Sequence, residues 1–209
     1  MARTSGISSR NANFDRRYFQ RFYENPATRV AAADDYRRTA KFIAAYLAVL
    51  EISVTSILDL GAGTGRLLRA LGRHFPDARR QGVDCSEYAC QRYGWRRESV
   101  ADFRAGRWDL VICHDVLQYL PREDAARALQ NLAERCRKAL FFTALTREDW
   151  LMHCDQGRTD SAVWLRSRGW YVQRLRPDFE ALGGGLHLRR GAAAARLALQ
   201  APDRGAPAA

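Results

Sequence analysis

The sequence predicts an α/β protein built on a mostly parallel sheet that is covered by helices on both faces. The main observation is that, from residue 56 onward, short apolar runs alternate with segments of helical periodicity. The run at 108–116 is typical of a buried strand, as parallel sheets covered on both faces require. A length of 209 residues and a hydrophobic content of 47% suffice for one well-buried domain.

Each apolar run is bounded by turn or helix signals. The runs interpreted as strands are SILDL (56–60), RQGVDCS (80–86), RESVADF (97–103, a strand or a turn), WDLVICHDV (108–116), KALFFTAL (138–145), WYVQRLR (170–176) and GGGLHLRR (183–190). The helices expected between them cover 65–75, 87–94, 122–136, 146–154 and 159–169. Pro76 stops the first of these helices, and Pro121, followed by acidic residues, begins the third.

Two helices are expected before the sheet. In the first, Phe14, Tyr18 and Phe22 recur every four residues and form an aromatic face that ends near Pro26. A second, apolar stripe predicts a helix that runs to about Leu50. The chain therefore divides into a flexible lead (1–13), two N-terminal helices (14–50), a main domain (51–190) and a low-complexity tail (191–209).

The cysteine content and the lengths of the apolar runs indicate which kinds of protein this chain can be. The five cysteines are odd in number and form no CxxC pair, so we expect reduced thiols, with neither a disulfide framework nor a zinc site. No apolar run reaches the length of a membrane span, and the N-terminus lacks the apolar region of a secretory signal. We therefore expect a cytoplasmic protein without a membrane partner.

The net charge of +11 raises the alternative of a nucleic-acid partner. All 34 basic residues except Lys41 and Lys138 are arginines, and they are scattered along the chain instead of forming one dense run. This scatter disfavours a dedicated nucleic-acid surface without excluding it.

The stretch DLGAGTGR, which follows the first strand, carries the strongest functional signal. Ligands of open parallel sheets collect beyond the carboxyl ends of the strands, where this turn lies. A dinucleotide fingerprint requires G-x-G-x-x-G, but Arg66 takes the place of the third glycine. Asp59 would also repel a pyrophosphate. The turn is therefore better suited to a ligand with a cationic group.

The stretch ILDLGAGTG (57–65) resembles motif I of the class I S-adenosylmethionine-dependent methyltransferases. GVDCS (82–86), SVADF (99–103) and WDLVICHDVLQYLP (108–121) resemble the next three motifs of that family, in the same order. The resemblance covers about residues 42–190. It implies a Rossmann-like three-layer sandwich with a seven-stranded, mostly parallel sheet whose last strand is antiparallel. It also implies S-adenosylmethionine as the cofactor and an N-terminal helical lid.

The resemblance assigns roles to particular residues. It implies that Asp59 supports the methionine end of the cofactor and that Asp84 accepts hydrogen bonds from both ribose hydroxyls. The remaining cofactor contacts that it implies are Gly61, Ala62 and Gly63 in the turn, Cys85, Asp102 and Phe103 around the adenine, and His114 at the end of the fourth strand. Arg29 is a candidate partner for the methionine carboxylate.

Methyl transfer from a sulfonium needs a positioned nucleophile and sometimes a base, but no metal. His114 is the candidate base, and a purely cofactor-contacting role for it stays open. Tyr18 and Tyr23 are expected to line the substrate under the lid. The prediction is a methyltransferase acting on a small molecule. The alternatives are an RNA or protein methyltransferase and a non-catalytic cofactor-binding protein. The acceptor atom and the oligomeric state stay open.

Overall fold

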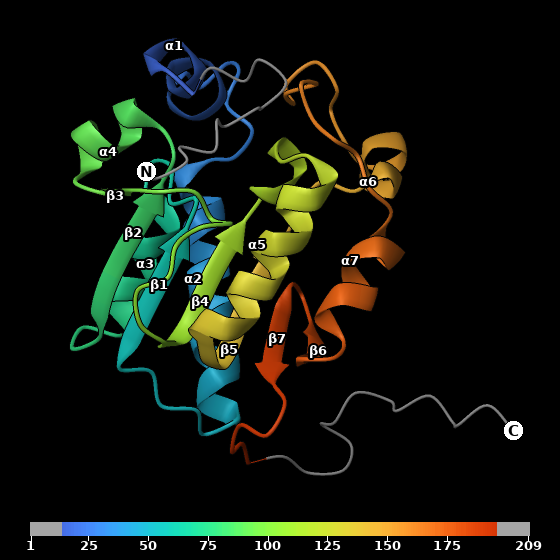
Figure 1. The fold of residues 1–209 in the computed structure, drawn as a ribbon. Helices are drawn as coiled ribbons and strands as arrows, with labels where there is room; N and C mark the ends of the chain where they lie inside the picture. Colours follow the sequence, from blue (N-terminus) through green and yellow to red (C-terminus); the bar gives the residue numbers. More distant parts are fainter. Residues whose placement is uncertain (1–13, 196–209) are drawn as a thin grey trace, which may run out of the picture.

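The computed structural model describes residues 14–195, which form a central sheet between layers of helices (Figure 1). The strands are β1 (Ser56–Leu60), β2 (Arg79–Asp84), β3 (Arg96–Arg97), β4 (Trp108–His114), β5 (Cys136–Thr143), β6 (Phe179–Gly183) and β7 (Leu186–Arg189). The helices are α1 (Arg16–Phe19), η1 (Gln20–Glu24), α2 (Ala33–Val49), α3 (Arg66–His74), α4 (Glu87–Tyr93), η2 (Leu117–Tyr119), α5 (Arg122–Arg135), α6 (Arg147–Met152) and α7 (Arg168–Leu175).

The strand order of the sheet is β3-β2-β1-β4-β5-β7-β6. The first five strands pair in parallel, and β7 runs antiparallel between β5 and β6. The expected seven-stranded, mostly parallel sheet with an antiparallel last strand is confirmed. The chain order reverses between β1 and β4. The carboxyl ends of these two strands therefore flank the crevice where open α/β sheets bind ligands.

The two faces of the sheet are buried by different helices. Leu58 of β1 packs in a core cluster with residues of α5 and α7, whereas its neighbour Ile57 packs in a second cluster with residues of α2 and α3. Both side chains are fully buried. Successive strand residues thus point to opposite faces, and both faces are apolar, as expected for a parallel sheet between helical layers.

The region before the last two strands differs from the expectation. Residues 170–176 were predicted as a strand, but they lie mostly in α7, and β6 forms later in the chain. Aromatic and β-branched residues favour strands in general. Here the Ser167 side chain accepts a hydrogen bond from the Trp170 N–H at the start of the helix, and Trp170, Tyr171 and Leu175 are buried on one side of it. The predicted helix at 159–169 is instead a loop up to Ser167.

The N-terminal part of the described chain is helical, as predicted. The Asp15 side chain accepts a hydrogen bond from the Tyr18 N–H and begins α1, which continues into a π-helix, η1. π-Helical turns occur frequently at functional sites. In Figure 1, this aromatic segment (residues 14–25) lies above the end of the sheet where β1, β2 and β4 terminate.

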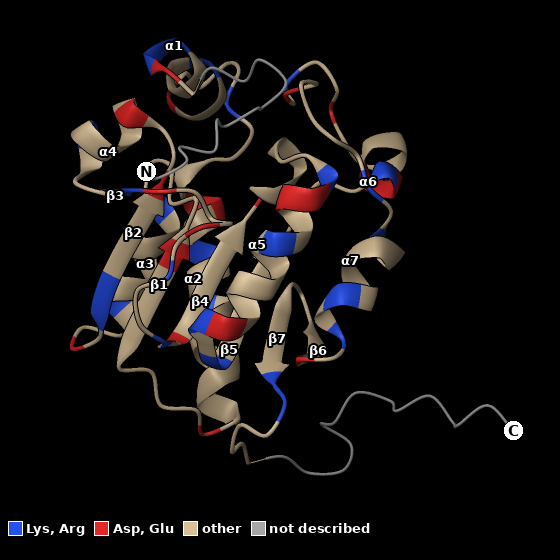
Figure 2. Ribbon diagram, in the orientation of Figure 1, with Lys and Arg blue, Asp and Glu red and all other residues tan. Residues whose placement is uncertain are grey.

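Charges are unevenly placed on the fold. In Figure 2, basic residues are distributed over several helices and strands, whereas acidic residues gather at the ends of the central strands below the aromatic segment. None of the helices in the described part of the chain has the length and apolar character needed to cross a bilayer. The predicted lead (1–13) and most of the predicted tail (191–209) lie outside the described residues.

Candidate functional site

Two adjoining cavities lie at the carboxyl ends of β1, β2 and β4. The larger has a volume of about 460 Å³ and the smaller about 90 Å³. Both are lined by the same seven residues, which come from the aromatic segment, the turn after β1 and the turn after β4: Tyr18, Tyr23, Gly61, Gly63, His114, Asp115 and Tyr119. These shared residues mark the junction through which one elongated ligand can occupy both spaces.

The turn after β1 requires glycine for steric and conformational reasons. Gly61 has a φ of +85°, and a Cβ atom at this position would lie 2.3 Å from Val116 Cγ2. The N–H groups of Gly61 and Ala62 both donate to the carbonyl of Val83, at 2.8 and 3.0 Å. The turn is thus fixed to β2 while its backbone borders the cavity.

Asp84 lies at the end of β2 and holds the glycine turn from the other side. One carboxylate oxygen accepts from the Gly63 N–H at 2.7 Å, and the other accepts from the Ser86 N–H at 2.8 Å. Burial raises the pKa of Asp84, and these backbone donors oppose that rise. Cys85 lines the same smaller cavity, and burial raises the pKa of its thiol to about 12, so the thiol stays protonated at neutral pH.

Asp59 and Arg66 both line the larger cavity, and their side chains differ in charge. Asp59 is 3% exposed, and burial, followed by the charge of Asp84, raises its pKa to about 7. Among the described residues, the buried Nη1 of Arg66 has no hydrogen-bond partner. A ligand that brings both a cationic and an anionic group, such as the ammonium and carboxylate of an amino acid, would satisfy both side chains.

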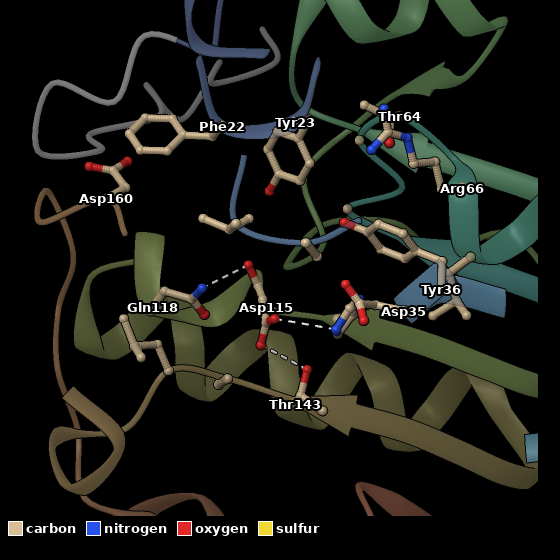
Figure 3. A pocket seen from close by; sticks show the side chains of 18 of the residues that line it. Phe22, Tyr23, Asp35, Tyr36, Thr64, Arg66, Asp115, Gln118, Thr143 and Asp160 are labelled. Carbon is tan, nitrogen blue, oxygen red and sulfur yellow. Dashed lines mark hydrogen bonds and ion pairs between the residues drawn. The ribbon is translucent and has the colours of Figure 1, made fainter. Parts of the chain in front are cut away.

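His114 and Asp115 form the turn after β4. His114 Nε2 lies 3.3 Å from Asp115 Oδ2, and Thr143 Oγ1 donates to Asp115 Oδ1 at 2.8 Å. Gln118 Nε2 donates to the backbone carbonyl of Asp115 at 2.8 Å (Figure 3). Asp115 adopts a φ of +56°, which is uncommon for residues other than glycine. Strained backbone of this kind, held by several partners, clusters at functional sites.

The aromatic segment encloses the junction from above. Tyr18 donates from its hydroxyl to the hydroxyl of Tyr119 at 2.9 Å, and Phe14 makes edge-to-face contacts with both rings. Burial raises the pKa of Tyr18, Tyr23 and Tyr119 above the usual tyrosine value. These phenols are therefore neutral at neutral pH, and their rings line the space between the two cavities.

A comparison with known protein families shows which kind of domain contains this site. Residues 58–139, which run from β1 to β5 and include both turns described above, match the family model described as a methyltransferase domain. A methyltransferase domain thus spans the strands and turns that form this site. The fold expected from the motif resemblance is confirmed, and the domain match agrees with the expected cofactor, S-adenosylmethionine. No curated protein matches the chain in sequence.

Solved methyltransferases share the fold at low sequence identity. An O-methyltransferase family protein from Burkholderia thailandensis aligns over 77% of this chain with a TM-score of 0.56 and 15% identity, and the chain spans 58% of that protein's length. Magnesium protoporphyrin IX methyltransferase from Synechocystis PCC 6803, solved with SAH, aligns over 74% of this chain and 83% of its own, with a TM-score of 0.55 and 19% identity. The plantazolicin methyltransferase BpumL, solved with a triazolic desmethylPZN analog and SAH, aligns over 78% of this chain and 75% of its own (TM-score 0.59, 17% identity).

The site fits an elongated, zwitterionic cofactor of this kind. The glycine turn admits close backbone approach, and the Asp84 carboxylate keeps free lone pairs for further donors because each oxygen can accept more than one hydrogen bond. Asp59 and Arg66 would hold the ammonium and the carboxylate of an amino-acid group, because both line the larger cavity. When bound, S-adenosylmethionine supplies an electrophilic methyl group attached to a sulfonium. After transfer of the methyl group, the sulfur is left as a neutral thioether.

Most of the predicted site residues lie together around the two cavities. Of the residues expected to contact cofactor or substrate, the structure places the following at one or both: Tyr18, Tyr23, Asp59, Gly61, Ala62, Gly63, Asp84, Cys85 and His114. Arg29 lines neither cavity but a surface hollow beside Arg158, which adjoins the larger cavity. The arginine that lines the larger cavity is Arg66.

Asp102 and Phe103 are the exceptions, and neither lines a cavity. Asp102 is half-exposed and lies 3.8 Å from Arg127, and Phe103 is buried in the core beneath α5. The physical reason is a tight turn in which the N–H groups of both residues donate to the carbonyl of Ser99, so the chain turns away before reaching the site. The cavity wall at this position is instead formed by Glu98, Ser99 and Val100.

Sequence reasoning also missed several lining residues. They are Tyr36, Arg66, Asp115, Gln118, Tyr119 and Thr143. Asp115, Gln118 and Tyr119 follow β4 directly, so their place at the carboxyl end of a central strand was the available signal. Thr143 ends β5, which runs parallel to β4, and carries the same signal. Tyr36 carries none, because helix periodicity does not show which residues meet a ligand.

Proposed function

We propose that this methyltransferase acts on a small-molecule acceptor, which binds in the larger cavity. The observation that carries the proposal is the size of that cavity and the two segments that wall it. The cavity measures about 460 Å³, within the usual range of small-molecule pockets. The aromatic segment covers one side, and residues from the loop after α6, including Cys154 and Asp160, close another. A folded macromolecule could present only a thin protrusion to such a space.

The cofactor is proposed to lie across both cavities. Its adenosine lies at the smaller one, with the ribose hydroxyls donating to Asp84 and the adenine between Cys85 and Val100. Because this cavity measures only about 90 Å³, the aromatic segment that borders it must move to admit the adenosine. Its methionine group extends into the larger one, where Asp59 meets the ammonium and Arg66 the carboxylate. This orientation places the transferable methyl group near Asp115, beside the acceptor space.

The chain's own contribution to the reaction is positioning, exclusion of water and removal of a proton. Tyr18, Tyr23 and Tyr119 wall the junction, so the acceptor is held close to the methyl group in a dry site. His114, adjacent to Asp115, is proposed as the group that accepts a proton from the acceptor. Positioning of this kind is worth several orders of magnitude in rate even without a strong base.

The net charge of +11 favours a second candidate, an RNA or protein acceptor. Incorporation of labelled methyl from S-adenosylmethionine separates the two. A cell extract is divided into small molecules, RNA and protein, and each fraction is offered as acceptor. We expect label in the small-molecule fraction. Label confined to RNA or protein would overturn the proposal, and label in no fraction would favour a non-catalytic cofactor-binding protein.

A further inference from the structure

The inner lining of the larger cavity is acidic, although the chain as a whole is strongly basic. Five aspartates line this cavity: Asp35, Asp59, Asp115, Asp149 and Asp160. Arg66 is the only lysine or arginine among the lining residues that the structure describes. Since scattered arginines give the chain a net charge of +11, the acidic interior is a local property of the site and not a consequence of composition.

Three of these aspartates have roles that do not involve the acceptor: two hold the start of a helix and one faces the cofactor. Asp35 accepts a hydrogen bond from the Ala32 N–H at the start of α2, at 2.7 Å. Asp149 accepts from the Thr146 hydroxyl at 2.6 Å at the start of α6. Asp59 faces the methionine group of the cofactor in the orientation proposed above. Asp115 and Asp160 also accept hydrogen bonds, from the Thr143 hydroxyl at 2.8 Å and the Ala162 N–H at 2.9 Å, but neither caps a helix. Each carboxylate keeps further lone pairs, and these are the ones that remain for the acceptor.

The side chain of Gln118 independently indicates that the acceptor carries a hydrogen-bond donor. This side chain is 4% exposed, and its Nε2 is used in the hydrogen bond to the carbonyl of Asp115. Its buried Oε1 has no hydrogen-bond partner among the described residues, and Gln118 lines the larger cavity (Figure 3). An unpaired buried carbonyl costs free energy until a ligand donates to it.

We propose that the acceptor is an amine, whose ammonium or amino group is bound by Asp115, Asp160 and the Oε1 of Gln118. This inference rests on the proposed function. All three groups accept hydrogen bonds, so they match a ligand that donates several, and the two carboxylates match a positive charge. An alcohol offers a single donor, and a carboxylate would be repelled. The neutral rings of Tyr23 and Tyr36 add faces that favour a cation.

The reaction that follows is N-methylation. The ammonium first loses one proton to the His114–Asp115 pair, whose side chains are 3.3 Å apart. The freed lone pair on nitrogen forms the new N–C bond while the C–S bond of the donor breaks and its electron pair remains on sulfur. The product is a protonated, methylated amine together with neutral S-adenosylhomocysteine, so charge and protons balance.

The test uses the full chain saturated with S-adenosylhomocysteine and probes that share a carbon skeleton. One set is benzylamine, benzyl alcohol and benzoate, and another is butylamine, butanol and butyrate. Competitive binding measured by ligand-observed NMR is expected to rank each amine about tenfold or more above its alcohol and carboxylate, because charge-assisted hydrogen bonds exceed neutral ones. Equal binding within each set, or no binding by either amine, overturns the inference.

Charge-removing variants localise the effect. Asp115→Asn and Asp160→Asn keep the size of the side chain, and asparagine tolerates the positive φ at position 115. Each is expected to lower amine affinity about tenfold while S-adenosylhomocysteine still binds. Asp77→Asn, at an exposed position outside both cavities, makes the same charge change and should have no effect. Unchanged amine binding in both site variants contradicts the inference.

The labelled methyl group distinguishes this inference from the function on which it rests. Mass spectrometry of labelled small molecules should find the methyl group on nitrogen. Label found on the oxygen, carbon or sulfur of small molecules overturns the amine and leaves the proposed function standing. Label confined to RNA or protein, or absent altogether, overturns both.

Discussion

A carboxylate oxygen of Asp84, at the end of β2, accepts a hydrogen bond from the backbone N–H of Gly63 at 2.7 Å. The residue expected to bind the ribose therefore also ties the glycine turn after β1 to the neighbouring strand. Cofactor binding and turn geometry depend on the same side chain, which has consequences for its substitution.

Asp84→Ala is expected to lower the affinity for S-adenosylhomocysteine by about 2–4 kcal/mol, because two charge-assisted hydrogen bonds are lost. Asp84→Asn keeps an acceptor for part of these contacts and should cost less. Isothermal titration calorimetry measures both. Asp77→Asn serves as the control for charge. Wild-type affinity in a folded Asp84→Ala variant would show that the ribose lies elsewhere.

Gly61→Ala tests the close approach of the turn to Val116. The new Cβ would lie 2.3 Å from Val116 Cγ2 in a left-handed backbone. Gly94, at the end of α4, also has a positive φ of +76° but has nothing within 4 Å of an added Cβ. Gly94→Ala should therefore cost only the backbone strain, about 1–2 kcal/mol of unfolding free energy. Urea denaturation should show a larger loss for Gly61→Ala, and equal losses would contradict the steric argument.

The raised pKa of Asp59, about 7, predicts a pH dependence of stability in the cofactor-free protein. The folded state holds the proton more tightly than the unfolded state, in which the carboxyl has the ordinary aspartate pKa of 3.8. The contribution of Asp59 to stability should therefore fall as pH rises from about 4 to 7 and then level off. Asp59→Asn should remove this component and stabilise the empty protein at pH 8, as thermal unfolding at several pH values can show.

The raised pKa of Asp59 also predicts that cofactor affinity depends on pH, with a trend opposite to that of stability. A ligand ammonium favours the ionised form of Asp59, so the affinity for S-adenosylhomocysteine should weaken as pH falls from about 8 to 6. Calorimetry at these pH values should also detect proton release on binding. An affinity that rises toward pH 6 would place the ammonium away from Asp59.

The aromatic segment should behave as a lid. We expect residues 14–25 to exchange their amide hydrogens slowly once S-adenosylhomocysteine is bound, and faster in its absence. Tyr18→Ala removes the hydroxyl contact with Tyr119 and should reduce that protection, whereas Tyr46→Ala, on the opposite side of the sheet from α5, should not. Hydrogen exchange that is equally fast with and without ligand would refute the lid.

Those parts of the site that are set by local geometry could be predicted from the sequence. The place of Asp59, Gly61 and Asp84 follows from the order of strand, turn and helix, because neighbouring strand ends meet at one edge of a parallel sheet. The roles expected of them came from the motif resemblance. Tertiary packing decided the rest. Aromatic residues at 170–171 favour a strand locally but are buried on a helix. Arg66 was recognised only as a departure from a glycine pattern, because the burial of its Nη1 depends on segments distant in sequence.

The proposed orientation of the cofactor is tested most directly by a crystal structure of the protein with S-adenosylhomocysteine. We expect the ribose hydroxyls on Asp84, the ligand ammonium beside Asp59, its carboxylate on Arg66 and its sulfur facing the cavity bordered by Asp115. Adenosine in the larger cavity, or a carboxylate remote from Arg66, would contradict this orientation and the acceptor site that depends on it.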